Sequence, residues 1–394
     1  MPGYPAAQTR SPLPPVKVAV MLPARRARAP GDASRPDRLH TRVGAGSPVT
    51  RLRRSERTTE PRLVSAGRTG TGRYFIETEA SSIRFVVIGA GRLGAGLALA
   101  LRSRGAALLG FTANSPAGRA RAETWLGGRA SADLADLVDT GPDLYVIAVP
   151  DQVVAEVAHR LGLALAAATD GPRPVVAHTS GVTSVTALSP CERVGAATLV
   201  FHPLQTFSEP LTGSARFAGA AIAITPSDPR PGAPAASLGF ALARALDARP
   251  FLLSDDKRGL YHAAAAFACN YLVTLEYHAE QLFTAAGLPA DEALPLFLPL
   301  VRATLDNIAA QGPVAALTGP LSRGDTHTIA SHLDALAADA PHLLAVYRAL
   351  GLATLELVRA RGEVDPAAIA GLELLLETPD PQPVSAAQPH EPGA

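Results

Sequence analysis

The sequence IRFVVIGAGRLG at residues 83–94 decides the fold of this chain. An apolar run at residues 85–88 leads directly into three glycines with the spacing G-x-G-x-x-G, and helix-forming residues follow at 97–101. A buried strand that turns through glycines into a helix is typical of a Rossmann-type unit. We therefore predict a dinucleotide-binding turn that consists of Gly89, Ala90, Gly91, Arg92, Leu93 and Gly94. A turn in which the glycines serve structure alone is the alternative.

The three glycines have separate expected roles. Gly89 permits the tight turn, Gly91 lets the backbone approach a pyrophosphate, and Gly94 lets the helix pack closely on the strand. The first amide groups of the helix would face the anion, because they have no partners within the helix.

The segment after the second expected strand, at residues 107–112, indicates which dinucleotide would bind. A site for NAD normally has Asp or Glu there, which accepts hydrogen bonds from the ribose 2′-hydroxyl. The sequence TANSPAGRAR at 112–121 contains no acid. Asn114, Ser115, Arg119 and Arg121 instead suit a 2′-phosphate, so we expect NADP(H) as the cofactor. Alternatively, these residues form only the solvated start of the next helix.

Further apolar runs predict the rest of an α/β domain over residues 82–254. We expect strands at 144–149, 174–177, 196–201, 220–224 and 250–253. The first two are nearly continuous apolar runs, as strands buried on both faces of a parallel sheet require. Ligands of such sheets bind beyond the carboxyl ends of the strands, where Val149, Pro150, His178 and Ser180 fall. Val149 and Pro150 are therefore expected to line the cofactor cleft.

The pattern changes after Ser254 to long segments rich in Ala and Leu, separated by Gly and Pro. We predict helices at about 257–286, 290–311, 326–337 and 340–361, and thus an all-α second domain over residues 255–378. Ser254 is the expected N-cap of the first helix, which Gly287 and Pro289 end. Gly312 and Pro313 end the next helix.

The two ends of the chain have a different composition. Residues 1–80 hold 15 basic and six acidic side chains and many prolines, so we expect a disordered extension. Repeated prolines argue against a transit peptide, and Lys17 and the arginines after it argue against a secretory signal. Arginine makes up nearly all the basic residues, as in GC-rich genes, so this segment could derive from a start codon assigned too far upstream. Residues 379–394 are an expected disordered tail.

Whole-chain composition excludes several classes of protein. Of the 394 residues, 47% are hydrophobic and 18% charged, with 36 basic against 35 acidic side chains, which is typical of a globular protein. Two cysteines, Cys191 and Cys269, cannot form a disulfide framework, and no Cys/His spacing indicates a metal site. Charged or polar residues interrupt the most apolar stretches, so we expect no membrane span. We predict a cytoplasmic protein that binds neither membrane nor nucleic acid, since the basic segment lacks interleaved aromatics.

Four segments carry a family resemblance over about residues 82–378. They are GAGRLG at 89–94, HTSG at 178–181 with FHPLQTF at 201–207, KRGLYH at 257–262 with NYL at 270–272, and ALTGPLSRGD at 316–325. Together they resemble bacterial proteins in which a Rossmann-like domain precedes the domain of unknown function DUF2520. This family is similar to the 6-phosphogluconate dehydrogenase-like superfamily, which includes hydroxyisobutyrate dehydrogenase, ketopantoate reductase and pyrroline-5-carboxylate reductase. The resemblance implies NADP(H) binding and pairing of helical domains into a homodimer, but no particular substrate.

Lys257 is the first candidate for proton transfer, because it is the only lysine among residues 81–394. A buried lysine can lose its proton, whereas arginine cannot. It resembles the catalytic lysine of hydroxyacid dehydrogenases, which have Asn four residues later. Here that position is Tyr261, followed by His262, and either could donate the proton instead. Asn270 could orient a substrate oxygen or bind a buried backbone group, and Lys257 could simply be solvated.

Other polar residues form a candidate substrate-binding set. Donors at the ends of two strands could bind the nicotinamide carboxamide or a substrate carbonyl: His178, Ser180, His202 and Gln205. Arg323 could hold a carboxylate or phosphate through two hydrogen bonds. Asp325 completes this set, and could alternatively cap the next helix or pair with Arg323.

These residues predict an NADP(H)-dependent oxidoreductase. It would transfer hydride between the nicotinamide and a small, anionic carbonyl, hydroxy-acid or imine substrate, and the resemblance makes a ketopantoate-like 2-oxo acid one candidate. The alternative is a non-catalytic NADP(H)-binding sensor or scaffold. Tyr261 at the position of the expected Asn favours this alternative, while the number of titratable groups near the expected cleft favours the enzyme.

Overall fold

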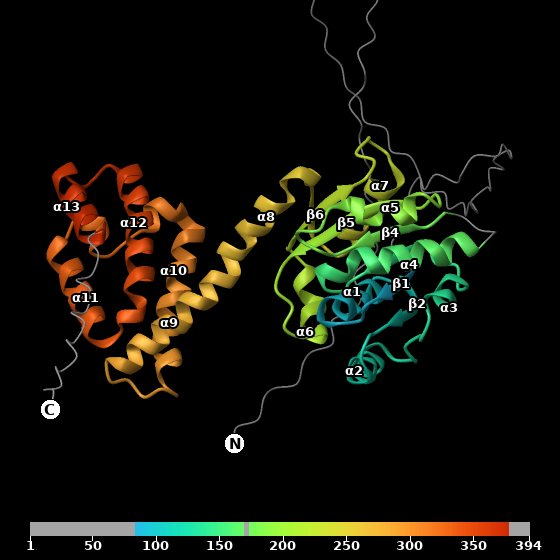
Figure 1. Cartoon of the computed structure of the whole chain (residues 1–394), viewed down its shortest axis with the longest axis horizontal. Helices are drawn as coiled ribbons and strands as arrows, with labels where there is room; N and C mark the ends of the chain where they lie inside the picture. The colour runs from blue at the N-terminus through green and yellow to red at the C-terminus, as the bar shows by residue number, and fades with distance from the viewer. Residues whose placement is uncertain (1–82, 169–172, 378–394) are drawn as a thin grey trace, which may run out of the picture. The chain divides into compact units, whose positions relative to one another are not determined.

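The computed structural model describes residues 83–168 and 173–377, in which a sheet with helices precedes an all-helical region (Figure 1). The predictions made for residues 1–80 and 379–394 lie outside the described part of the chain.

Seven strands form one sheet, close to where the sequence predicts them. They are β1 (Arg84–Ile88), β2 (Ala107–Thr112), β3 (Leu144–Ile147), β4 (Val175–His178), β5 (Ala197–Leu204), β6 (Ala221–Pro226) and β7 (Arg249–Leu252). Their order across the sheet is β2-β1-β3-β4-β5-β6-β7. The predicted α/β fold is therefore confirmed. The main difference is β5, which extends to Leu204, so that His202 lies within the strand and not after it.

Strand direction determines where a ligand site can form. All neighbouring strands are parallel except β5 and β6, which are antiparallel. The register pairs Ile88 with Ile147, Ile147 with His178, and His178 with Val200. The carboxyl ends of β1, β3, β4 and β5 consequently lie along one edge of the sheet, where α/β proteins bind their ligands.

Helices cover both faces of the sheet. The longer ones are α1 (Arg92–Ser103), α2 (Pro116–Leu126), α4 (Val154–Ala167) and α7 (Pro234–Ala245). Shorter helical segments are α3 (Leu134–Val138), η2 (Asp151–Val153), η3 (Val185–Leu188), α5 (Ser189–Glu192), α6 (Pro210–Ser214) and η4 (Ala215–Phe217).

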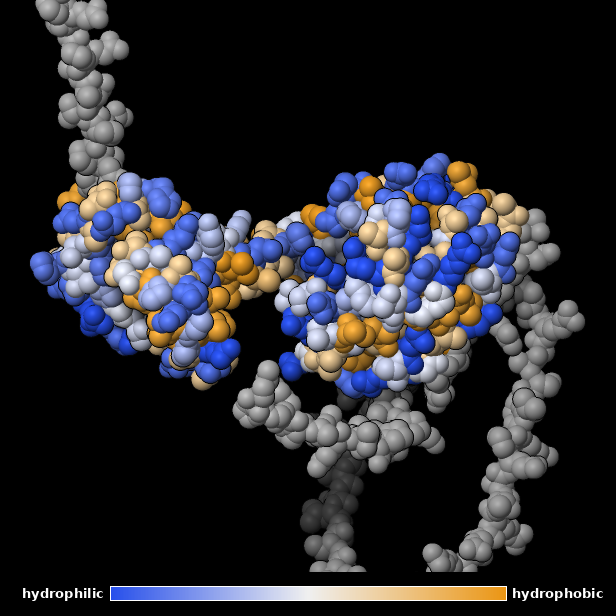
Figure 2. Space-filling model, turned by 90° about the horizontal axis from the view of Figure 1, so that it is seen from below, coloured by the Kyte–Doolittle hydropathy of each residue, from blue (hydrophilic) through white to orange (hydrophobic). Residues whose placement is uncertain are grey.

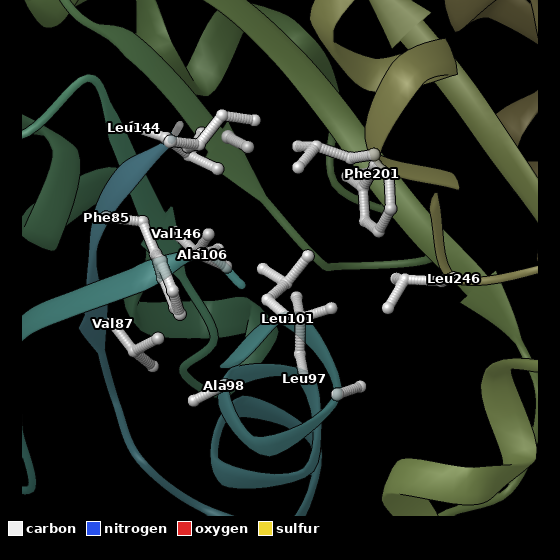
Figure 3. Packing of buried hydrophobic residues seen from close by; sticks show 14 of the residues in the cluster. Phe85, Val87, Leu97, Ala98, Leu101, Ala106, Leu144, Val146, Phe201 and Leu246 are labelled. Carbon is white, nitrogen blue, oxygen red and sulfur yellow. The ribbon is translucent and has the colours of Figure 1, made fainter. Parts of the chain in front are cut away.

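Side chains along each strand alternate between the two faces of the sheet, and an apolar core forms on each face. Phe85 and Val87 on β1 pack with residues of α1 and α7 on one face of the sheet (Figure 3). Val86 and Ile88 pack with residues of α3 and α4 on the other face. Because successive side chains point to opposite faces, a strand buried on both sides must be apolar throughout. This is the physical reason for the sequence pattern at residues 85–88.

The second region is all helical, as predicted. It contains η5 (Asp255–Lys257), α8 (Arg258–Ala265), a π-helical segment, η6 (Ala266–Asn270), and α9 (Tyr271–Ala285). These are followed by α10 (Ala293–Ala316), η7 (Leu321–Arg323), α11 (Thr326–Asp339), η8 (Pro341–Leu343), α12 (Leu344–Arg361) and α13 (Pro366–Glu377). An apolar core forms among α11, α12 and α13 around Leu333, Leu355 and Leu372.

The structure corrects two details of the helix predictions, at Ser254 and at α13, and confirms the predicted break at Gly312. Ser254 occupies the N-cap position of η5, but its hydroxyl donates to the carboxylate of Asp256 and caps no backbone amide. Gly312 has φ 80° and ψ 164°, so α10 breaks at the predicted position. Helix α13 was not predicted, although Pro366 at its start and apolar residues at helical spacing are signals for it.

Candidate active site

The glycine turn has the conformation that a dinucleotide-binding turn needs. Gly89 has φ +96°, and a Cβ there would lie 2.6 Å from the carbonyl oxygen of Ala148. A Cβ on Gly94 would lie 2.3 Å from the carbonyl oxygen of Gly89, so α1 starts tightly against the turn. A Cβ on Gly91 would meet no atom within 4 Å. The backbone at Gly91 is therefore open to an approaching ligand, while Gly89 and Gly94 are needed for the turn itself.

The start of α1 is suited to an anion. Gly91 is the N-cap residue of α1, and no side chain caps the helix. The amides of Gly89 and Ala90 donate to the carbonyl oxygen of Thr112 at 3.2 and 2.8 Å, which fixes the turn to the end of β2. The amides of the first turn of α1 lack intrahelical acceptors and carry the positive end of the helix dipole. The residues present thus fit the pyrophosphate of a dinucleotide.

The residues expected at the ribose have local partners. The Ser115 hydroxyl accepts a hydrogen bond from the Gly118 amide at 3.0 Å and caps α2. The Arg119 guanidinium donates to the carbonyl oxygens of Ala113 and Asn114, at 3.5 and 3.3 Å. The arginine is thereby held over the loop that follows β2, where a 2′-phosphate would lie. Recognition of that phosphate by Asn114, Ser115 and Arg119 stays a prediction.

The end of β3 connects the glycine turn with the polar residues farther along the edge. Val149 lies against the turn, since its Cγ1 would be 2.7 Å from a Cβ on Gly89. Pro150 follows, and Asp151 begins η2. The Asp151 carboxylate is close enough to His178, His202 and Arg258 to favour their charged forms. The predicted cofactor turn and these three side chains therefore lie at the same edge of the sheet.

His178 holds the loop after β4. Its side chain is completely buried, its Nδ1 accepts from the Ser180 amide at 3.2 Å, and its Nε2 contacts the Ser184 carbonyl oxygen at 3.3 Å. Burial lowers the pKa of His178 to about 4, so the ring is neutral and its proton is on Nε2. The Ser180 hydroxyl donates to Thr183 at 2.8 Å. The side chains of His178 and Ser180 thus hydrogen-bond within the loop, and their predicted contact with cofactor or substrate stays a prediction.

Arg258 is a functional candidate that the sequence reasoning missed. The side chain is buried, with 1% exposed. It donates to the carbonyl oxygens of Thr183, at 2.8 Å, and Ser180, and to the Thr225 hydroxyl at 3.1 Å. Asp255 strengthens the same connection by accepting from the Ser184 hydroxyl and the Val185 amide. Together they fix the start of α8 to the loop after β4.

Tyr261 and two histidines meet where α8 packs on β5. The Nδ1 atom of His202 lies 2.8 Å from the Tyr261 hydroxyl, and the ring centroids of His202 and His262 are 6.4 Å apart. A Cβ on Gly181 would lie 2.9 Å from Nε2 of His202 and 2.4 Å from Cδ2 of His262. Only glycine leaves room for these rings. We call His202, Tyr261, His262 and Gly181 the imidazole–phenol cluster.

Burial controls the protonation of this cluster. Burial, together with the nearby positive charge of Arg258, lowers the pKa of His202 to about 4. Burial raises the pKa of Tyr261 to about 12, although Arg258 acts in the opposite direction. At neutral pH the tyrosine therefore carries its proton and the histidine is neutral. A protonated phenol beside a neutral imidazole can donate a proton to a substrate atom.

Other predicted site residues lie apart from this cluster. The Lys257 side chain is 66% exposed, and its Nζ pairs with Asp256 at 3.0 Å. Gln205 and Asn270 are exposed, and Gln205 accepts a hydrogen bond from the Thr206 amide at 2.8 Å. Arg323 lies in η7, and Asp325 caps α11 by accepting from the Thr328 amide at 3.0 Å. Within residues 83–168 and 173–377, no hydrogen bond or ion pair joins these five side chains to the imidazole–phenol cluster.

Family models match two successive parts of the chain. A Rossmann-like domain matches residues 75–203, and a domain of unknown function, DUF2520, matches residues 232–354. The chain therefore contains a Rossmann-like domain and a DUF2520 domain. The first match includes His202, and the second includes Arg258, Tyr261 and His262. The imidazole–phenol cluster thus combines residues from both domains.

Several solved structures are similar to this chain. A Bacteroides fragilis protein described as a "putative NADP oxidoreductase" is 26% identical with a TM-score of 0.56, over 72% of this chain and 99% of its own. A Thermotoga maritima protein is 20% identical with a TM-score of 0.51, over 71% and 100%. A 1-pyrroline-5-carboxylate reductase from Streptococcus pyogenes is 15% identical with a TM-score of 0.48, over 74% and 99%. No curated protein matches the sequence.

Proposed function

We propose that this protein is an NADP(H)-dependent oxidoreductase, in which Tyr261 exchanges a proton with the substrate. The observation that carries the proposal is the hydrogen-bonded pair of Tyr261 and His202, 2.8 Å apart, at the sheet edge that also holds the open glycine turn. The 26% identity to a protein described as a "putative NADP oxidoreductase" supports the cofactor class.

Different residues of the chain would bind the different parts of the cofactor. The backbone of Gly91 and the first turn of α1 would hold the pyrophosphate, and the loop with Arg119 would hold the 2′-phosphate. Val149 and Pro150 would line the cleft beside the turn. When bound, the nicotinamide supplies or accepts a hydride.

The cluster supplies the proton that such a reaction needs. When a carbonyl or imine carbon is reduced, its oxygen or nitrogen must gain a proton. The Tyr261 hydroxyl can donate this proton if His202 Nδ1–H donates to the phenol oxygen, because the phenol proton is then free to face the substrate. The resulting phenolate would be stabilised by that hydrogen bond and by the positive charge of Arg258. His262 is a second donor in the same cluster.

This proposal replaces Lys257 with Tyr261 as the proton donor. The Lys257 ammonium is paired with Asp256 and is mostly exposed to solvent, so it does not lie in the cluster. The substrate would be a small anionic carbonyl, hydroxy-acid or imine compound, with a ketopantoate-like 2-oxo acid among the candidates. Arg323 is kept as the proposed residue for the anionic group.

The proposal is tested by titrating the purified full-length protein with NADPH and NADH and recording fluorescence. We expect NADPH to bind more tightly than NADH, and Arg119→Ala to weaken NADPH binding about 10-fold while NADH binding stays unchanged. Arg160→Ala is the matched control, because Arg160 is an exposed arginine on α4, outside the predicted cofactor site. Oxidation of NADPH is then screened with 2-oxo acids and cyclic imines.

A non-catalytic NADP(H)-binding sensor is the second candidate. The exposed Lys257 favours it, because Lys257 resembles the catalytic lysine of hydroxyacid dehydrogenases but does not lie in the cluster. A protein that binds NADPH but oxidises it with none of the tested substrates would support the sensor over the enzyme. A protein that binds neither cofactor would contradict both.

A further inference from the structure

Asp151 lies at the carboxyl edge of the sheet, between the glycine turn and the loop after β4. It follows β3, which pairs with β1 on one side and with β4 on the other. Two residues before it, Val149 lies against the glycine turn, since its Cγ1 would be 2.7 Å from a Cβ on Gly89. On the other side, β4 ends at His178. The strand order thus places this acid between the predicted cofactor turn and the loop that carries Gly181.

The Asp151 carboxylate has no structural partner that explains it. Its side chain is exposed, and within residues 83–168 and 173–377 it makes no hydrogen bond or ion pair. Although Asp151 begins η2, no side chain caps η2 or the following α4. Figure 2 shows hydrophilic and hydrophobic residues interspersed over the visible face of the α/β domain, so an exposed acid is not unusual by itself. Its position is unusual, because its charge favours the charged forms of His178, His202 and Arg258.

The charges around His178 leave this edge of the sheet with an excess of negative charge. Three charged side chains act on His178, of which Arg258 is positive and Asp151 and Asp255 are negative. Arg258 is bound to the loop after β4, and the Asp255 carboxylate accepts from the Ser184 hydroxyl. Because His178 is neutral, the group carries one negative charge in excess. Asp151 is the member whose charged atoms are not bound to the described part of the chain.

The sign of this excess charge discriminates between possible reacting groups. A carbonyl group is neutral and gains negative charge on its oxygen during reduction, so a nearby carboxylate opposes the reaction. An imine that gains a proton becomes a cationic iminium, which a nearby carboxylate stabilises. A carboxylate at this position therefore favours the reduction of C=N over the reduction of C=O.

We propose that Asp151 is a specificity-determining residue, which selects substrates that react as a protonated imine over neutral carbonyl compounds. The imine nitrogen would gain the proton of the Tyr261 hydroxyl and the imine carbon would gain the hydride, so that C=N becomes a single bond. The imine is thereby reduced and the nicotinamide oxidised, and the Tyr261 phenolate regains a proton from water. The product amine binds a proton in water and is again a cation. This inference rests on the proposed function, whose substrate class it names.

Equilibrium binding to the full-length protein tests the selection of charge. Calorimetric titration, with and without saturating NADP⁺, compares two carboxylates of similar size. They are pipecolate, which has a cationic nitrogen, and 2-hydroxyhexanoate, which has a neutral hydroxyl. We expect the wild-type protein to bind pipecolate about 10-fold more tightly, and Asp151→Asn to remove most of this difference. Asp136→Asn is the matched control and should behave as the wild type, because Asp136 is an exposed aspartate on α3, outside the predicted site.

The same selection should appear in turnover with NADPH. We expect a higher kcat/KM for the cyclic imine 1-piperideine-2-carboxylate than for 2-oxohexanoate. Asp151→Asn should lower the ratio of these two values by about 100-fold, because the carboxylate acts on charge that is present during the reaction. The dissociation constant of NADPH should change by less than about 2-fold in the same variant.

Several results would overturn the assignment of Asp151. Pipecolate that binds no more tightly than 2-hydroxyhexanoate contradicts it, as does an unchanged difference in Asp151→Asn. A loss of NADP⁺ affinity relative to NADPH in this variant would assign the carboxylate to the cationic ring of the oxidised cofactor. Failure of the wild-type protein to bind NADPH contradicts the proposed function, whereas the titrations without cofactor still measure the selection of charge.

Discussion

At the scale of single residues, the contact between Tyr261 and His202 determines what the cluster can do. The tyrosine comes from α8 and the histidine from β5, and both are largely removed from water. Burial keeps the phenol protonated and the imidazole neutral at the same pH. A substrate oxygen placed at the phenol would therefore meet a proton donor and not an anion.

Removal of the Tyr261 hydroxyl tests this role. We expect Tyr261→Phe to lower kcat by about 10²–10⁴-fold, the usual contribution of a general acid. The dissociation constant of NADPH should change by less than about 2-fold, because the substitution removes an interaction made only in the transition state and leaves ground-state binding of the cofactor intact. Steady-state kinetics with a substrate found in the screen, combined with the fluorescence titration, measures both quantities. Unchanged kcat would exclude Tyr261 as the proton donor.

The buried His178 and the partly buried His202 predict how stability depends on pH. The pKa of His178 and of His202 falls from 6.5 to about 4 on folding. The unfolded chain therefore binds more protons than the folded chain between these values, and stability declines as the pH falls from about 6.5 toward 4. Urea denaturation at several pH values should show this decline. In His202→Asn the dependence of stability on pH should be weaker by about one bound proton, and an unchanged dependence would contradict a neutral His202.

At the scale of elements, the loop between β4 and η3 determines how α8 sits on the sheet. Arg258 joins α8 to this loop through Ser180 and Thr183, and Gly181 in the same loop lies against the rings of His202 and His262. Arg258, Tyr261 and His262 lie at i, i+3 and i+4, so they share one face of α8. The arginine therefore positions Tyr261 and His262, the proposed proton donors, through its hydrogen bonds to the loop.

Substitution of Arg258 should disturb both stability and the cluster. Arg258→Met would leave two buried carbonyl oxygens without donors, and we expect it to destabilise the protein by about 2–4 kcal/mol. Loss of the positive charge would also raise the pKa of His202, which Arg258 lowers. Thermal denaturation and an NMR titration of His202 measure the two effects. Lys257→Met is the matched control, and equal melting temperatures of the two variants would contradict the positioning role.

Gly181 provides an independent test of the packing at the cluster. Gly181→Ala would place a methyl group 2.4 Å from Cδ2 of His262, so the rings or the loop must move. We expect turnover to fall while NADPH affinity is kept. Gly259→Ala on α8 is the control, because its Cβ would meet no atom within 4 Å, and the helix should gain up to about 1 kcal/mol. Full activity of Gly181→Ala would show that the ring positions do not matter.

The sequence allowed most elements to be predicted, but only part of the site. All seven strands were predicted because apolar runs and glycine turns depend on local sequence. The choice of Lys257 over Arg258 was not supported, since adjacent helix positions differ in burial only after α8 has packed on the loop. The pairing of Tyr261 with His202 joins residues 59 positions apart, so local sequence contained no signal for it.

At the scale of the whole molecule, the glycine turn and the imidazole–phenol cluster serve different steps of the proposed reaction. The start of α1 can accept a phosphate, because α1 begins without a capping side chain. The cluster would exchange a proton with the substrate. Cofactor binding and turnover can therefore be measured separately, and the proposed reaction requires both.

Titration of the wild-type protein and of Gly91→Asp with NADPH tests the central claim most directly. Aspartate fits this position, because a Cβ there meets no atom within 4 Å and Asp is a favoured N-cap residue. The fold should thus be kept, while the carboxylate would repel a pyrophosphate at the start of α1. We expect NADPH to bind to the wild-type protein and to bind about 100-fold more weakly to Gly91→Asp. Equal binding to both proteins, or binding to neither, would contradict the dinucleotide site.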